Sequence, residues 1–136
     1  MYKHILTPTD GSELAHKAVV HGLSLAKALG AQITVLSVQP SITPSRFEEY
    51  VKEMRAQTAS VLNQIAVAAE DAGVQCETMQ VTHDHPHEAI IAVAKDEGCD
   101  VIVMASHGRS GIVSILLGSV TAKVLAHATI PVVVYR

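Results

Sequence analysis

The run Val101-Ile102-Val103-Met104 contains no polar side chain, and the fold class is predicted from it. A second run, Val132-Val133-Val134, has the same character. A strand with one face in water alternates apolar and polar residues, whereas a strand buried on both faces is apolar throughout. The two runs therefore predict strands of a mainly parallel sheet that helices cover on both faces.

Outward from these runs, β-branched segments alternate with segments of helical length. The five predicted strands span residues 4–7, 32–38, 74–81, 100–105 and 131–135. Regular alternation of strands and helices is typical of an α/β domain with right-handed crossovers. We expect an open, doubly wound sheet, and the residues alone leave the order of its strands open.

Four helices are predicted between the strands. Ser12 is suited to the N-cap of the first helix and Gly30 to the position after its end. One stripe of this helix carries Ala15, Ala18, Val19, Gly22, Ala26 and Leu29. The second and longest helix is expected to begin at Thr43-Pro44 and to end before Gly73. Its apolar period comprises Phe47, Val51, Met54, Val61, Leu62, Ile65 and Ala69.

The last two helices are shorter. His85-Pro86 predicts the start of the third, because proline is favoured at the first helical position. This helix carries Ile90, Ile91 and Ala94 and ends before Gly98. The fourth is expected over residues 119–127.

Composition narrows the classes of function. The chain has 136 residues, 49% of them apolar and 17% charged, with a formal charge of -3. This length suits one domain over residues 1–136, and the acidic balance lacks the basic footprint of a protein that binds nucleic acid or an anionic membrane. We expect a soluble cytoplasmic protein, because the two cysteines form no disulfide framework and the sequence has neither a leader pattern nor a long apolar run.

Two loops follow the predicted first and fourth strands, where open α/β sheets bind ligands. The second loop, residues 105–119, contains Gly108, Gly111 and Gly118. The start of the fourth helix offers unpaired N–H groups to a phosphate, and the hydroxyls of Ser119 and Thr121 would add donors. Arg109 would add a charge-assisted bond. The same residues also fit an ordinary connection from strand to helix in which glycine permits the turn.

Known nucleotide loops do not match the chain. It contains no G-x-x-x-x-G-K-[ST] and no G-x-G-x-x-G after the first strand, which argues against a P-loop ATPase and a Rossmann dehydrogenase. In the first loop, Asp10 has several interpretations: it could accept from a ribose or base, bind a metal, or cap the first helix with Ser12.

Four stretches of the chain together resemble the universal stress protein family over essentially the whole length. These are residues 5–12, residues 35–38, the glycine loop, and residues 120–134. The nucleotide-binding branch of that family carries G-x2-G-x9-G-[ST], and this chain has Ala105-x2-Gly108-x9-Gly118-Ser119. Ala105 therefore replaces the first glycine, and its methyl group could crowd a ligand.

The resemblance implies an ATP site with Mg²⁺ or Mn²⁺ on the phosphates. By position, Pro8, Thr9 and Asp10 would meet the ribose and base edge, and Val38 would contact adenine. Met104 and Ala105 would line the same cleft. The residues around the triphosphate would be Gly108, Arg109, Gly118, Ser119, Val120 and Thr121. His107 could bind a phosphate or pack in the turn.

The resemblance also implies architecture. The family's sheet, an adenine nucleotide alpha hydrolase-like fold, has five parallel strands in the order 3-2-1-4-5 and helices on both faces. It further implies a homodimer joined through residues 130–136, and pairing there would remove an exposed strand edge.

A histidine cluster lies outside these motifs, in the sequence His83-Asp84-His85-Pro86-His87-Glu88. His83, His85 and His87 are candidate metal ligands, although their spacing matches no fixed zinc pattern. They are equally interpreted as solvated loop residues that titrate near neutral pH.

Three functions remain open. The first is a stress-response regulatory module that binds ATP. The second is a slow ATP hydrolase, since no P-loop lysine or fixed base supports fast turnover. The third is a dimeric interaction protein that works without nucleotide, for which Ala105 is the sequence argument.

Overall fold

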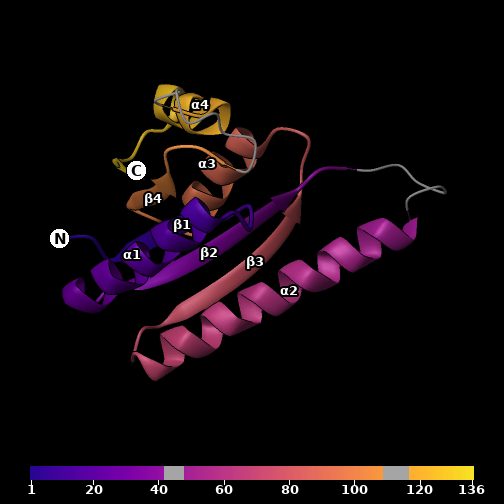
Figure 1. Ribbon diagram of the computed structural model, residues 1–136. Helices are drawn as coiled ribbons and strands as arrows, with labels where there is room; N and C mark the ends of the chain where they lie inside the picture. The colour runs from indigo at the N-terminus through magenta and orange to yellow at the C-terminus, as the bar shows by residue number, and fades with distance from the viewer. Residues whose placement is uncertain (42–47, 109–116) are drawn as a thin grey trace.

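A computed structural model describes residues 1–41, 48–108 and 117–136 of the chain (Figure 1). Strands and helices alternate along it. Their bounds are β1 His4–Pro8, α1 Glu13–Leu29, β2 Gln32–Gln39, α2 Glu48–Asp71, β3 Cys76–Thr82, α3 Pro86–Asp96, β4 Val101–Ala105, α4 Ser119–His127 and β5 Val132–Tyr135. The predicted alternation and the bounds of α4 are confirmed.

The five strands form one sheet in the order β3-β2-β1-β4-β5, and every neighbouring pair is parallel. The expected order 3-2-1-4-5 is therefore confirmed. From β1 the chain adds strands β2 and β3 toward one edge of the sheet and then β4 and β5 toward the other. This topological switch point lies between β1 and β4, where Leu6 aligns with Ile102. Parallel sheets bind ligands beyond the carboxyl ends of the strands at such a point.

Two hydrophobic cores lie on opposite faces of the sheet, as the apolar run in β4 predicts. Val101 and Val103 pack with residues of α1 and α2 in one core. Ile102 and Met104 pack with residues of α3 and α4 in the other. Figure 1 shows α3 and α4 on the side of the sheet opposite α2. Both faces of β4 are consequently buried.

Local signals set the ends of α1. The Ser12 hydroxyl accepts from the Ala15 N–H at 3.2 Å, and Gly30 adopts a left-handed conformation with φ of 65°. Glycine takes this conformation without the penalty of a Cβ atom. Both predicted caps are confirmed.

Two residues that the helical periodicity groups with the core are on the surface. Leu29 is 40% exposed at the last turn of α1, and Val61 is 38% exposed in α2. The stripe that α2 buries is narrower than predicted and is formed by Leu62, Ile65 and Ala69. The expected start of this helix at Thr43-Pro44, together with Phe47, lies outside the described residues.

Three strands begin later than expected. β3 starts at Cys76, β4 at Val101 and β5 at Val132. The N–H of Val74 donates to the Ala69 carbonyl at the end of α2, so Val74 is buried without joining a ladder. Within the described residues, none of the helices combines the length and apolar character needed to cross a bilayer.

Candidate functional site

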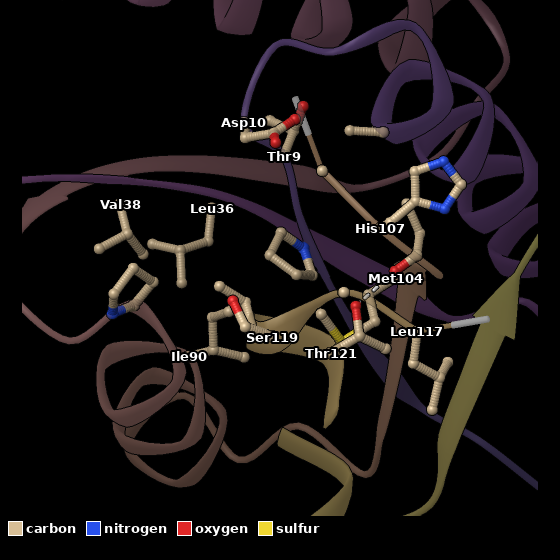
Figure 2. Close-up of a pocket in the computed structure, with 17 residues that line it drawn as sticks. Thr9, Asp10, Leu36, Val38, Ile90, Met104, His107, Leu117, Ser119 and Thr121 are labelled. Carbon is tan, nitrogen blue, oxygen red and sulfur yellow. Dashed lines mark hydrogen bonds between the residues drawn. The ribbon is translucent and has the colours of Figure 1, made fainter. Parts of the chain in front are cut away.

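A cavity of about 600 Å³ opens beyond the carboxyl ends of β1 and β4 (Figure 2). Residues of both predicted ligand loops meet there, together with side chains from β2 and α3. Its walls are formed by Pro8, Thr9, Asp10, Ala15, Leu36, Val38, Pro86, Ile90, Met104, Ala105, His107, Gly108, Leu117, Gly118, Ser119, Val120 and Thr121. The cavity thus lies at the switch point of the sheet.

The cavity has an apolar part and a polar part. Leu36 and Val38 of β2, Ile90 of α3 and Met104 of β4 supply apolar side chains, and Figure 2 shows them around one region. Asp10 and Ser119 add polar groups. An apolar wall with a few polar groups is typical of small-molecule sites.

Two helix N-termini contribute to the same wall. Pro86 is the first residue of α3, Ser119 is the first residue of α4, and both line the cavity. Neither helix has a side-chain hydrogen bond at its N-cap, whereas α1 is capped by Ser12. Because each helix N-terminus carries partial positive charge, this edge of the cavity favours an anion.

Close packing at Gly118 holds the start of α4. Its N–H donates to the Ser106 carbonyl at 2.7 Å. A Cβ atom on Gly118 would lie 3.0 Å from the Cα of His107, so any larger residue must push this backbone away. Helix geometry leaves the N–H groups of Ser119, Val120 and Thr121 without acceptors inside α4.

Asp10 and Gly108 bring the two loops together. The Asp10 carboxylate accepts from the Ser12 N–H at 2.9 Å, which supports the capping interpretation of this residue. A Cβ atom on Gly108 would collide with the other carboxylate oxygen. Glycine at position 108 therefore permits the first loop to lie directly against the second.

Ala105 does not crowd the cavity in the way its methyl group suggested. Side chains alternate along a strand, so Ala105 faces the side of Val101 and Val103, opposite to Met104. Both residues line the cavity, which remains open beside the Ala105 methyl group. Substitution of the family's glycine by Ala105 is accordingly compatible with an open site.

The Thr121 hydroxyl, which the sequence predicts as a phosphate donor, has a hydrogen-bond partner within the fold. Thr121 is buried, and its hydroxyl donates to the Ala105 carbonyl at 2.8 Å. A hydroxyl has one proton, so this group has no second donor for a phosphate. Thr121 joins α4 to the end of β4 instead.

Every predicted nucleotide-binding residue within the described ranges lines the cavity, and Arg109 lies outside those ranges. His107 also lines it, with its Nδ1 atom 3.1 Å from the Ser106 hydroxyl. Sequence reasoning missed Ala15, Leu36, Pro86, Ile90 and Leu117. Leu36 could have been found from Val38, because residues two apart in a strand share a face.

Neither cysteine lines the cavity. Burial, reinforced by Glu97, Asp100 and Glu77, raises the pKa of the Cys99 thiol to about 11. Burial and Glu77 raise the pKa of Cys76 as well. Because thiolates are the reactive form, both residues are poor nucleophiles at neutral pH.

The histidine cluster forms a row beside the cavity. Ring centroids lie 6.0 Å apart for His83 and His85, 6.3 Å for His85 and His87, and 5.8 Å for His87 and His127. In the part of the chain that the structure describes, no three His, Cys, Asp or Glu side chains are grouped to hold a metal ion.

Comparisons with known proteins agree with this geometry. The model of the universal stress protein family matches residues 1–136. The universal stress protein YxiE of Bacillus subtilis is 32% identical and aligns over 100% of both chains.

Solved structures give the same result. The structure of protein MJ0577 from Methanocaldococcus jannaschii is 34% identical, with a TM-score of 0.81 over 99% of this chain and 96% of that chain. A universal stress protein family protein from Arabidopsis thaliana, solved with AMP bound, has a TM-score of 0.73 at 22% identity, over 98% of this chain and 90% of that chain. At this identity, the similarity to the Arabidopsis protein shows a shared fold.

Proposed function

Because the chain belongs to the universal stress protein family, we propose that it binds an adenine nucleotide, ATP, in the cavity between the β1 and β4 loops. The observation that carries this proposal is the convergence of two uncapped helix N-termini, those of α3 and α4, on a cavity with an apolar wall. Helix N-termini of this kind bind anionic groups such as phosphates, and an apolar wall provides packing for a flat aromatic base.

In this proposal the phosphates lie at the start of α4. The N–H groups of Ser119, Val120 and Thr121 and the Ser119 hydroxyl donate to phosphate oxygens. Gly118 and Gly108 let those oxygens approach the backbone.

The base occupies the apolar part, against Leu36, Val38, Ile90 and Met104. Thr9 and Asp10, at the end of β1, lie where a ribose would join base and phosphate. The AMP-bound Arabidopsis protein with this fold supports the choice of an adenine nucleotide.

A divalent cation fits as a companion of the nucleotide. Mg²⁺ and Mn²⁺ prefer oxygen ligands, and the cavity wall offers the Asp10 carboxylate and the Ser119 hydroxyl. So small a donor set suits an ion that is held chiefly by phosphate oxygens. The ion would neutralise phosphate charge at the start of α4.

We assign this site a regulatory role. A bound nucleotide would join β1, β2, α3 and α4, whose residues form one wall. It would therefore stabilise their relative positions by binding the native state alone. We also propose that the chain forms a homodimer through residues 130–136, since β5 is the last strand at one edge of the sheet.

Calorimetry with Mg-ATP and extraction of nucleotide from freshly purified protein test the proposal. We expect stoichiometric adenine nucleotide, or heat and a raised Tm on addition of Mg-ATP. Gly118→Val should abolish both effects, because its side chain cannot be accommodated against the His107 backbone and must shift the start of α4, where the phosphates would lie. Ala126→Val, which adds a branched side chain at an exposed position of the same helix, should leave binding unchanged.

Two results would contradict the proposal: wild-type protein that carries no nucleotide and shows neither heat nor a Tm shift with millimolar Mg-ATP, or Gly118→Val protein that binds as wild type does.

A further inference from the structure

His83 closes the turn that leads into α3. Its Nδ1 atom accepts a hydrogen bond from the backbone N–H of His85 at 2.9 Å. This is the geometry of an Asx turn, in which a side-chain acceptor binds the N–H two residues later, with an imidazole in place of Asn or Asp. An Nδ1 atom that accepts is unprotonated, so the turn requires neutral His83.

The turn is attached to β2 on one side and to α3 on the other. The His83 N–H donates to the Gln39 carbonyl at 2.8 Å. The His85 carbonyl accepts from the N–H groups of Glu88 at 3.0 Å and Ala89 at 3.2 Å, so it carries the first turn of α3. His85 is the N-cap of that helix and has no side-chain hydrogen bond that caps it.

The first turn of α3 is also cavity wall. Pro86 follows His85 directly, and both Pro86 and Ile90 line the cavity. A change in the backbone at residues 83–85 therefore moves the apolar surface against which a ligand packs.

The charges around His83 oppose one another. Glu88 of α3 has a carboxylate oxygen 3.9 Å from the His83 Nε2 atom and favours the imidazolium. Asp84, whose carboxylate accepts from the Ser41 N–H, is its neighbour in the loop. The α3 N-terminus disfavours added positive charge, and the rings of His85, His87 and, beyond them, His127 of α4 would do so where they are themselves protonated.

From this arrangement we propose that protonation of His83 opens the 83–85 turn and displaces the first turn of α3, so that the cavity binds its nucleotide more weakly at acidic pH. The nucleotide part rests on the proposed function. A protonated Nδ1 is a donor and faces the donor N–H of His85, so the hydrogen bond is lost. Glu88 then attracts the imidazolium away from the backbone.

Two substitutions of His83 separate the hydrogen bond from the charge. His83→Asn keeps an acceptor at nearly the same position and has no proton to gain, so it should hold the turn at every pH. His83→Leu removes the acceptor and should leave the turn open at every pH. His83 is partly exposed in the loop, so neither substitution removes core packing.

The first experiment uses ligand-free protein and NMR. Between pH 8 and 5.5, the His85 amide and the Ile90 methyl resonances should shift together in wild type. In His83→Asn the Ile90 methyl should remain constant and the His85 amide should shift less, through its own ring, and in His83→Leu the Ile90 methyl should stay at its low-pH position. An Ile90 methyl that does not follow the His85 amide in wild type, or that titrates equally in His83→Asn, would overturn the coupling whether or not the protein binds nucleotide.

The second experiment measures the Kd for Mg-ATP at pH 8.0 and 5.5. The nucleotide itself titrates in this range, so the comparison is between proteins. The increase in Kd on acidification should be about fivefold greater for wild type than for His83→Asn, the effect of one hydrogen bond. Equal increases would overturn the link to binding, whereas absence of binding at both pH values would count against the proposed function and leave the NMR result standing.

Discussion

The hydroxyl of Thr121 in α4 donates a hydrogen bond to the carbonyl of Ala105, the last residue of β4, at 2.8 Å. The two residues are sixteen positions apart, and the segment between them contains the glycine loop. This contact anchors the helix N-terminus at which we place the phosphates. It also engages, within the fold, a hydroxyl that the sequence predicts as a phosphate donor.

Thr121→Val should lower the free energy of unfolding by about 1–3 kcal/mol, because it leaves a buried carbonyl without this donor. Thr121→Ser keeps the hydroxyl and should lower the free energy of unfolding by less. Chemical denaturation of the three proteins measures the difference. Equal losses for Val and Ser would show that packing, not the hydrogen bond, makes this residue important.

Gly108→Ala should weaken nucleotide binding roughly tenfold, since its methyl group collides with the Asp10 carboxylate and separates the two loops. Removing the carboxylate should remove most of the conflict. In an Asp10→Ala background the same Gly108→Ala change is therefore expected to cost much less affinity. A calorimetric double-mutant cycle tests this, and additive effects would refute the steric explanation.

Thr7→Val should raise the free energy of unfolding by about 1 kcal/mol. The Thr7 hydroxyl is fully buried in β1 and has no hydrogen-bond partner in the described part of the chain. Replacing an unsatisfied polar group by a methyl group of similar size removes its desolvation cost.

Thr34 provides the matched control for Thr7. It is equally buried in β2, but its hydroxyl lies 2.7 Å from the Nε2 atom of His4. Thr34→Val should therefore destabilise the protein by about 1–3 kcal/mol. Urea denaturation of both variants should give changes of opposite sign, and changes of the same sign would contradict the assignment.

Stability should fall in acid partly through Asp100. Burial raises the pKa of this carboxyl. The N–H groups of Lys3, His4 and Asp100 itself, together with the nearby His4 ring, lower it by more, so the net pKa is below its usual value. A depressed pKa stabilises the fold above the unfolded-state pKa of about 3.9, and this contribution disappears as pH falls through the folded-state pKa.

Asp100→Asn should thus be less stable than wild type at pH 7, by at most about 1 kcal/mol for a partly exposed group, and the difference should be smaller at pH 2.5. Urea titrations at the two pH values measure this difference. Asp96→Asn, at an exposed position of α3, is the control and should show no such dependence. A constant difference at both pH values would exclude the carboxylate charge as the cause.

Much of the fold follows from patterns between near neighbours in the chain. The unbroken apolar run in β4 predicts helices on both faces, and both cores are found. Ser12 and Gly30 mark the ends of α1 through hydrogen bonds and backbone preferences that operate over a few residues. Such signals are local, so sequence alone is sufficient to read them.

The candidate site could be predicted only where its residues lie in the two strand-end loops. Gly108, Gly118 and Asp10 are predicted at the site because they lie in the loops after β1 and β4, where open α/β sheets bind ligands. Pro86 and Ile90 were missed, since only the packing of α3 on the sheet brings them to the cavity. Leu29 and Val61 were misassigned for the same reason: periodicity identifies a face but not whether another element covers it.

The residue types therefore specified the elements, their caps and the two ligand loops, because these depend on interactions within a few positions along the chain. Only the tertiary structure could decide that Asp10 lies against Gly108, that Thr121 is bound to Ala105, and that the His83 turn supports a cavity wall. Each of these relations depends on distances between segments that are brought together by the order of the strands, and no single segment carries that information.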